Sequence, residues 1–175
     1  MELMTPDQRD ELLGTFKRDA FHLELRDSYG AAYEDAPIAR WLRGEPDDFA
    51  WLQPRLDRVR RATRAGKTVR RIRVISEPLT DYIRWEHSVT RLNQEAGEDI
   101  RWLPRHLLPQ GLVFPVGGND WWLFDDELVT VGHFHGDGRI KGSQLVTEPD
   151  TVAECVSVRD RLWRLATPHD EYKPA

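Results

Sequence analysis

The chain has 175 residues, of which 39% are hydrophobic and 31% are charged, and its net charge at pH 7 is −5. This length and composition fit one folded domain and exclude a disordered chain, while the acidic balance argues against a general nucleic-acid binder. No apolar run is long enough to span a bilayer, and the first residues lack the pattern of a signal peptide, so we expect a cytoplasmic protein.

Residues 1–66 are predicted to form a mainly helical lobe. A helix begins at Thr5, because a hydroxyl caps the first turn well and Pro6 suits its first position. Apolar spacing and breaker residues predict four further elements, which are a strand over 21–25 and helices over 37–42, 45–52 and 54–65.

A strand, a turn, a helix and a second strand are predicted between Thr68 and Leu103, and the rest of the chain is arranged around this unit. The first strand is rich in β-branched residues and ends before Ser76. Apolar residues recur at helical spacing from Tyr82, and Gly97 stands where a left-handed C-cap belongs. In such a unit, polar groups at the carboxyl end of the first strand open onto a crevice.

The C-terminal part is predicted to begin with a long connecting loop over 104–118. The elements expected after it are a hairpin over 121–124 and 128–131, a strand over 139–146, a helix that opens at 147–150, and a loose polar tail. We therefore expect a single α+β domain over residues 1–175, with a sheet and helix core over 67–166 and a tail over 167–175. Its central sheet is mixed or antiparallel, with helices mainly on one side.

Polar and aromatic side chains near the predicted strand end form a candidate ligand or partner site. This set comprises Glu77, Asp81, Arg84, His87, Trp121, Trp122 and Asp125. Glu77 or Asp81 would suit a general base, and Arg84 would suit an anionic group. Helix capping and a solvent-exposed face explain the same polar residues, and core packing explains whichever of the two tryptophans points inward.

His133, His135 and Asp137 lie at alternate positions and would share one face of a strand. A His-x-His pair offers two imidazoles to a metal ion, but the sequence identifies no further ligands. The alternative is a pair of exposed histidines that precede a turn. Cys155 is the only cysteine, which excludes an internal disulfide and a cysteine-based zinc site. No cofactor is predicted, since neither a glycine-rich phosphate loop nor a nucleophile elbow is present.

The densest charge run lies between Arg55 and Arg73, where nine Lys or Arg accompany one acid, Asp57. Its candidate nucleic-acid contacts are Arg58, Arg61, Arg64, Arg71 and Arg73. A solvated helix face followed by an exposed strand face would carry the same residues. Because the domain as a whole is acidic, direct nucleic-acid binding is the less favoured interpretation.

Six segments together resemble an actinobacterial family of uncharacterised small proteins, a domain of unknown function often encoded beside helix-turn-helix transcriptional regulators. These segments are 20–27, 41–44, 76–84, 96–101, 119–126 and 168–172. The resemblance covers nearly the whole chain. It implies a regulatory or accessory role, with a helix-turn-helix regulator as an expected partner.

A second resemblance concerns the fold. The strand-helix-strand unit and the following hairpin over 123–132 are similar to the second part of a phospholipase D-like unit. Enzymes of that family place a nucleophilic His and a Lys shortly before the Asp that Asp125 would match. Gly118 and Asp120 occupy those positions here, so the resemblance implies a phospholipase D-like half without the catalytic pair.

A crowded polar and aromatic strand end without a complete catalytic set favours a non-catalytic binding or regulatory protein. It would engage a partner protein or a small ligand at the strand-end crevice. One alternative is a metal-assisted or acid-base hydrolase or transferase that uses Glu77, Asp81 or His133. The other is a nucleic-acid-associated protein that uses the basic run over 55–73.

Overall fold

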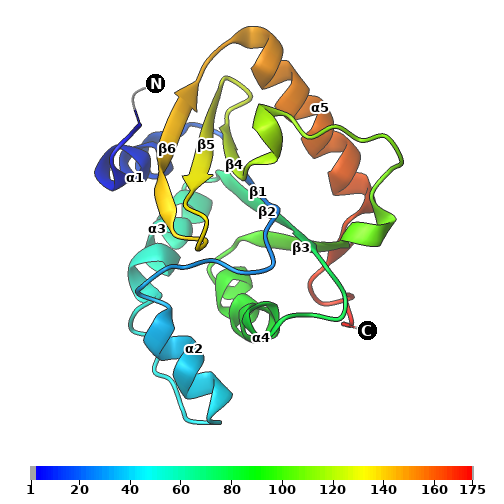
Figure 1. The fold of residues 1–175 in the computed structure, drawn as a ribbon. Coiled ribbons are helices and arrows are strands. Elements are labelled where there is room, and N and C mark those ends of the chain that lie inside the picture. Colours follow the sequence, from blue (N-terminus) through cyan, green and yellow to red (C-terminus); the bar gives the residue numbers. More distant parts are fainter. Residues whose placement is uncertain (1–2, 175) are drawn as a thin grey trace.

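Seven strands form one mixed sheet in the computed structural model, which describes residues 3–174 (Figure 1). The strand order is β6-β5-β4-β1-β2-β3-β7. The strands are β1 (Asp19–Glu24), β2 (Thr68–Ile75), β3 (Asp99–Pro104), β4 (Trp121–Phe124), β5 (Leu128–Phe134), β6 (Ile140–Val146) and β7 (Thr167–Pro168). β1, β2 and β3 run parallel, and the β4-β5-β6 meander joins β1 antiparallel. The predicted α+β fold with a mixed sheet is confirmed.

Five α-helices accompany the sheet in the described part of the chain. They are α1 (Pro6–Thr15), α2 (Asp35–Leu42), α3 (Gln53–Arg64), α4 (Asp81–Glu95) and α5 (Pro149–Leu165), with short 3-10 turns η1 (Arg105–Leu107) and η2 (Val116–Gly118) in the long loop. α1, α3 and α4 pack on one face and α5 packs on the other, while α2 projects away from the sheet beside α4 (Figure 1). The prediction that helices lie mainly on one side is therefore confirmed.

The central unit forms as its local signals predict. The Thr80 hydroxyl accepts a hydrogen bond from the Ile83 amide (3.2 Å) at the start of α4. Gly97 ends the helix with φ +100°, and a Cβ at this position would lie 2.7 Å from Thr63 Oγ1. Only glycine combines this backbone angle with such a close approach, so α3 and α4 can pack together at this turn.

Two predictions about the remaining segments are wrong. The helix expected over 45–52 is a turn, because the Asp47 carboxylate accepts from the Phe49 amide (3.0 Å) and from Trp51 Nε1 (2.9 Å). The tail expected to be loose pairs with the sheet through β7, and the Tyr172 ring stacks on Trp102 (5.5 Å between centroids). Within residues 3–174, no helix is both long and apolar enough to cross a bilayer.

Strand alternation sorts side chains between two faces and thereby positions the site. Phe21, Leu23 and Trp121 lie on the face that α5 covers. Trp122 lies on the opposite face, where it packs in the cluster of α1 and α3. The neighbouring positions of β1 and β2 on that second face carry charged and polar side chains instead of aliphatic ones.

Candidate functional site

A buried cluster of ion pairs lies on the α3 and α4 side of β1 and β2. Arg71 donates from Nη1 to Glu24 Oε1 (2.5 Å) and from Nε to Glu98 Oε1 (2.8 Å). Arg73 donates from Nε to Glu24 Oε2 (2.7 Å) and also pairs with Glu86 of α4. The parallel register places Glu24 opposite Arg73, and the period of two places Arg71 on the same face. Two strands and one helix therefore build the cluster together.

The protonation of this cluster follows from burial and pairing. Burial alone would raise the pKa of Glu24, but the adjacent Arg71 and Arg73 outweigh it and lower that pKa to about 2. Burial lowers the pKa of His22 to about 3, so this imidazole is neutral at physiological pH. Burial raises the pKa of Glu86, which Arg73 opposes.

Two buried nitrogens of the cluster, His22 Nδ1 and Arg71 Nη2, lack a hydrogen-bond partner in the described structure. Arg71 is 5% exposed, and its Nη2 makes no hydrogen bond within the described structure. A buried unpaired guanidinium nitrogen costs free energy, and an acceptor supplied by a ligand would remove that cost.

The cluster is continuous with a pocket on the same face. Arg55 of α3 reaches Glu98 Oε1 (3.3 Å), the oxygen that Arg71 also contacts. The Arg55 guanidinium lies 5.6 Å from the centre of the Trp122 ring, and Trp122 stacks on His22 at 4.2 Å. Arg55 thus joins the ion pairs to an aromatic wall.

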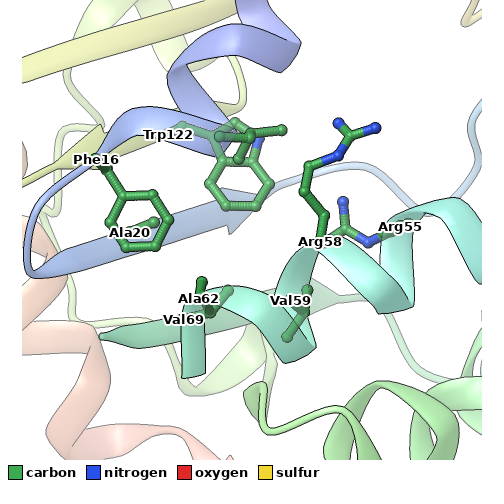
Figure 2. Close-up of a pocket in the computed structure, with 9 residues that line it drawn as sticks. Phe16, Ala20, Arg55, Arg58, Val59, Ala62, Val69 and Trp122 are labelled. Carbon is green, nitrogen blue, oxygen red and sulfur yellow. The ribbon is translucent and has the colours of Figure 1, made fainter. Parts of the chain in front are cut away.

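The pocket is a shallow hollow between α1, α3 and the sheet, which opens to solvent and has a cavity volume of about 30 Å³. Its lining residues are Leu13, Phe16, Ala20, Arg55, Arg58, Val59, Ala62, Val69 and Trp122. Figure 2 shows the two guanidinium groups near Trp122 at one end and the Phe16 ring at the other. Apolar walls with cations at one end suit a ligand that has a negative group and a flat or aliphatic part.

Four of the residues predicted for the strand-end crevice lie around α4, away from this pocket. Glu77 Oε1 accepts from the Tyr172 hydroxyl (2.7 Å). Asp81 and Arg84 pair with each other on the exposed first turn of α4. The His87 ring packs near Trp102, 5.2 Å between centroids. Their contacts hold α4 and the chain end in place.

The other three predicted residues separate across the sheet. Trp121 is fully buried in the core under α5, while Trp122 lines the pocket on the opposite face. Asp125 accepts from the amides of Lys17 (2.8 Å), Arg18 (2.6 Å) and Asp19 (3.0 Å). Trp122 is thus the only one of the seven predicted residues that lines this pocket, because the alternation of β4 sends its neighbour to the other side.

The strand end itself also carries a hydrogen-bonded network of residues outside the predicted set. The Ser76 amide and hydroxyl both donate to the Asp27 carboxylate (2.7 Å each). Arg105 Nη2 donates to the Leu25 carbonyl (2.8 Å). These contacts join the ends of β1, β2 and β3. Their sequence signal is weak, since Asp27 and Ser76 are 49 residues apart.

The residues of the predicted metal site contact different neighbours. His133 Nε2 is 3.1 Å from Gln144 Oε1 on β6. His135 and Asp137 belong to the turn before β6, where Asp137 accepts from the Arg139 amide (3.0 Å). Across residues 3–174, no group of three or more His, Cys, Asp or Glu side chains is arranged to hold a metal ion.

The basic segment predicted to bind nucleic acid divides into a surface part and an interior part. Arg61 and Arg64 are exposed on α3, and Arg58 lies at the pocket. Arg71 and Arg73 are buried, so their assignment to an exposed strand face is wrong. The reason is that β2 lies between β1 and β3 and is covered by helices on both faces.

Two tyrosine-carboxyl pairs were not anticipated from the sequence. The Tyr82 hydroxyl donates to Glu34 Oε2 (2.7 Å), and the Tyr29 hydroxyl donates to Asp120 Oδ2 (2.5 Å). Burial, followed by the charge of Glu86, raises the pKa of Glu34 to about 7. Burial raises the pKa of Asp120 to about 6. Local patterns cannot find these pairs, because their members are 48 and 91 residues apart.

Comparisons with known proteins identify the fold and the family. A phospholipase D family member, Nuc from Salmonella typhimurium, matches with a TM-score of 0.51 and 13% identity over 94% of this chain and 93% of that chain. NucT from Helicobacter pylori matches with a TM-score of 0.54 and 10% identity over 95% and 96%. At these identities the likeness shows the fold alone, and no curated protein matches by sequence. The sequence model of the Domain of unknown function DUF6879 matches residues 7–174, so the chain belongs to that family.

Proposed function

We propose that this protein is a non-catalytic binding module with a phospholipase D-like fold, and that it binds a small anionic ligand in the pocket beside α3. The observation that carries the proposal is the position of the Arg55 guanidinium over Trp122, at one end of an apolar hollow. The second guanidinium group in the lining, that of Arg58, supports it, because arginine is a frequent partner of carboxylate, sulfonate and phosphate oxygens.

The environment of Asp120 supports the non-catalytic part of the proposal. The phospholipase D resemblance puts Asp120 where those enzymes have a catalytic Lys and puts Gly118 where they have the His. Asp120 accepts from the Leu25 amide (3.0 Å) and from the Tyr29 hydroxyl (2.5 Å), and it is buried. This carboxyl group therefore serves the fold at a position where those enzymes need a cation.

The regulatory part of the proposal rests on the resemblance to a family encoded beside helix-turn-helix regulators. In this proposal the module is a cytoplasmic accessory protein that binds such a regulator, and its binding depends on whether the pocket holds a ligand. Affinity capture from the native host with wild-type protein and with Trp122→Leu tests it. Enrichment of a helix-turn-helix protein that the substitution reduces would support this role, and equal enrichment by both would contradict it.

Binding of anilinonaphthalene sulfonate, an aromatic anion, tests the pocket directly. We expect Arg55→Gln and Trp122→Leu each to weaken binding about tenfold, the effect of losing one charge-assisted or stacking contact. Arg61→Gln is the matched control, since Arg61 is exposed on the same helix but does not line the pocket. Fluorescence titration gives the affinities. Equal losses for Arg55→Gln and Arg61→Gln would show that binding is non-specific and would refute the proposed site.

A second candidate function, an acid-base hydrolase, is favoured by Glu34. This side chain is partly exposed, and its pKa of about 7, raised by burial and by Glu86, suits proton transfer at neutral pH. Chromogenic phosphodiester and carboxyl ester hydrolysis tests this function. We expect any turnover to fall at least about a hundredfold in Glu34→Gln, the lower bound of general acid-base effects, and to persist in Glu45→Gln. Turnover that Glu34→Gln leaves unchanged would remove this candidate.

A further inference from the structure

Residues 28–52, which include α2, form a strap that two hydrogen bonds of the same kind join to the core. At its start, the strap residue Tyr29 donates to Asp120, which precedes β4. Further along, the strap residue Glu34 accepts from Tyr82 of α4. We propose that this strap is a pH-responsive device, clamped by these two tyrosine-carboxyl hydrogen bonds and released from the sheet as the pH rises.

The strap also packs against the core along its length, where Tyr29, Ile38, Trp41, Phe49 and Trp51 contact the apolar cluster that includes Tyr82 and Trp85. Gly30 donates from its amide to the Gly138 carbonyl (3.1 Å), and the Trp51 ring stacks on Trp85 at 5.5 Å. Between them, α2 extends away from the sheet (Figure 1). The apolar side chains that make these contacts are only partly buried, and peripheral elements of this kind can open without global unfolding.

The charges that face Glu34 come from three other elements. Glu86 of α4 and Glu24 of β1 disfavour its ionisation, and Arg73 of β2 favours it. With burial as the largest cause, these groups raise its pKa from 4.5 to about 7. The ionised carboxylate of Glu34 would therefore add negative charge beside two other glutamates when the strap is closed.

The groups that face Asp120 come from β1, from the segment that follows it and from the strap. Burial raises its pKa from 3.8 to about 6, and Glu24 adds to this, while Tyr29, the Leu25 amide and Arg26 oppose it. The ionised form of Asp120 is thus also disfavoured in the closed structure.

The direction of the pH effect follows from proton linkage. With the strap open, both carboxyl groups meet water and regain their ordinary pKa values near 4.5 and 3.8. The closed form therefore binds more protons than the open form in the window between those values and about 7. Closure is fully favoured below this window and weakens as the pH rises through about 6 and then about 7. Raising the pH drives the strap open.

Opening would change access to the proposed ligand site. The strap residue Tyr33 lies close enough to Arg71 for the guanidinium charge to act on its phenol. Release of the strap would thus change the surroundings of Arg71, which belongs to the ion-pair cluster next to the pocket. This consequence rests on the proposed function, whereas the opening of the strap does not.

Hydrogen exchange measured by mass spectrometry tests the strap. After correction for intrinsic exchange rates, we expect protection of peptides from 28–52 to fall roughly tenfold between pH 6 and pH 8, because one pKa unit of difference corresponds to a factor of ten. Peptides from β2 should keep their protection. In the double variant Glu34→Gln/Asp120→Asn the fall should disappear. Glu45→Gln is the control, since Glu45 lies in the strap but pairs with Arg43 on the surface (2.6 Å). This variant should lose protection between pH 6 and pH 8 as the wild-type protein does.

Two results would overturn the inference. One is pH-independent protection of the strap in the wild-type protein, and the other is an equal fall in the double variant. If the double variant does not fold, Tyr82→Phe replaces it, because it keeps the ring and removes the hydroxyl that holds Glu34. This variant should show a less protected strap at pH 6, and unchanged protection there would refute the clamp. Titration of the dye in the same samples separates the two proposals. If Arg55→Gln leaves the dye affinity unchanged while the strap still responds to pH, only the proposed binding site is contradicted.

Discussion

Replacement of Arg71 by methionine is expected to lower the free energy of unfolding by about 3–5 kcal/mol. The substitution keeps much of the aliphatic volume but removes the shared partner of the Glu24 and Glu98 carboxylates, which are 2.5 Å and 2.8 Å from the guanidinium. Both glutamates are buried, so the variant leaves each carboxylate away from water with one arginine partner, Arg73 or Arg55, where the wild-type protein has two. Urea denaturation at pH 7 measures the change.

Arg91→Met provides the comparison for this experiment. Arg91 pairs with Glu95 on the exposed face of α4 (3.2 Å), and such surface pairs contribute about 0–1 kcal/mol. The pH dependence gives an independent check. In the wild-type protein Glu24 contributes stability above its ordinary pKa of 4.5, and this contribution is lost as the pH falls through about 2. Arg71→Met should reduce the loss of unfolding free energy per pH unit as the pH falls. Equal destabilisation by the two methionine variants would show that the buried pairs are not the source.

Replacement of Trp121 by alanine should cost about 3–5 kcal/mol, because it leaves a large cavity in the core under α5. Trp121 is fully buried, and its ring lies 5.3 Å from that of Phe21. Trp121→Phe should cost less than half as much. The indole Nε1 has no hydrogen-bond partner in the described structure, so phenylalanine removes volume without stranding an acceptor. Chemical denaturation of both variants measures the difference.

The dye titration distinguishes Trp121 from its neighbour. Trp121→Phe should leave binding of anilinonaphthalene sulfonate unchanged, because Trp121 lies on the opposite face of the sheet from the pocket. Trp122→Leu should weaken binding with the fold intact. Loss of binding in a folded Trp121→Phe variant would mean that the dye enters the α5 core instead of the pocket.

The pocket, the ion-pair cluster and the strap occupy one face of the sheet and share residues. Arg55 belongs to both the pocket and the cluster, and Glu24 acts on Glu34 of the strap as well as on Arg71. A ligand that pairs with Arg71 would compete with these buried carboxylates for its charge. Ligand binding and strap closure are therefore expected to influence each other through common partners.

Most helices and strands could be predicted from neighbouring residues alone. The cap at Thr80, the turn at Gly97 and the alternation around Trp121 depend on contacts within a few positions, so their chemistry is visible in the sequence. The same patterns predicted that one of the adjacent tryptophans is internal. They also predicted the mixed α+β sheet, and the phospholipase D-like resemblance agrees with the solved structures at the level of the fold.

The candidate site depended on which strands are neighbours. A run of arginines in β2 has the pattern of an exposed strand, yet the pairing of β2 with β1 and β3 buries Arg71 and Arg73 and supplies Glu24 as their partner. The polar residues after β2 were predicted to be a ligand site; in the structure Glu77 contacts Tyr172 of the chain end, and Asp81 pairs with Arg84 on α4. Whether a charged side chain is solvated or paired is set by residues that are distant in sequence, because burial is a property of the assembled layers. Local pattern therefore predicts an element and its face, and packing determines what that face contacts.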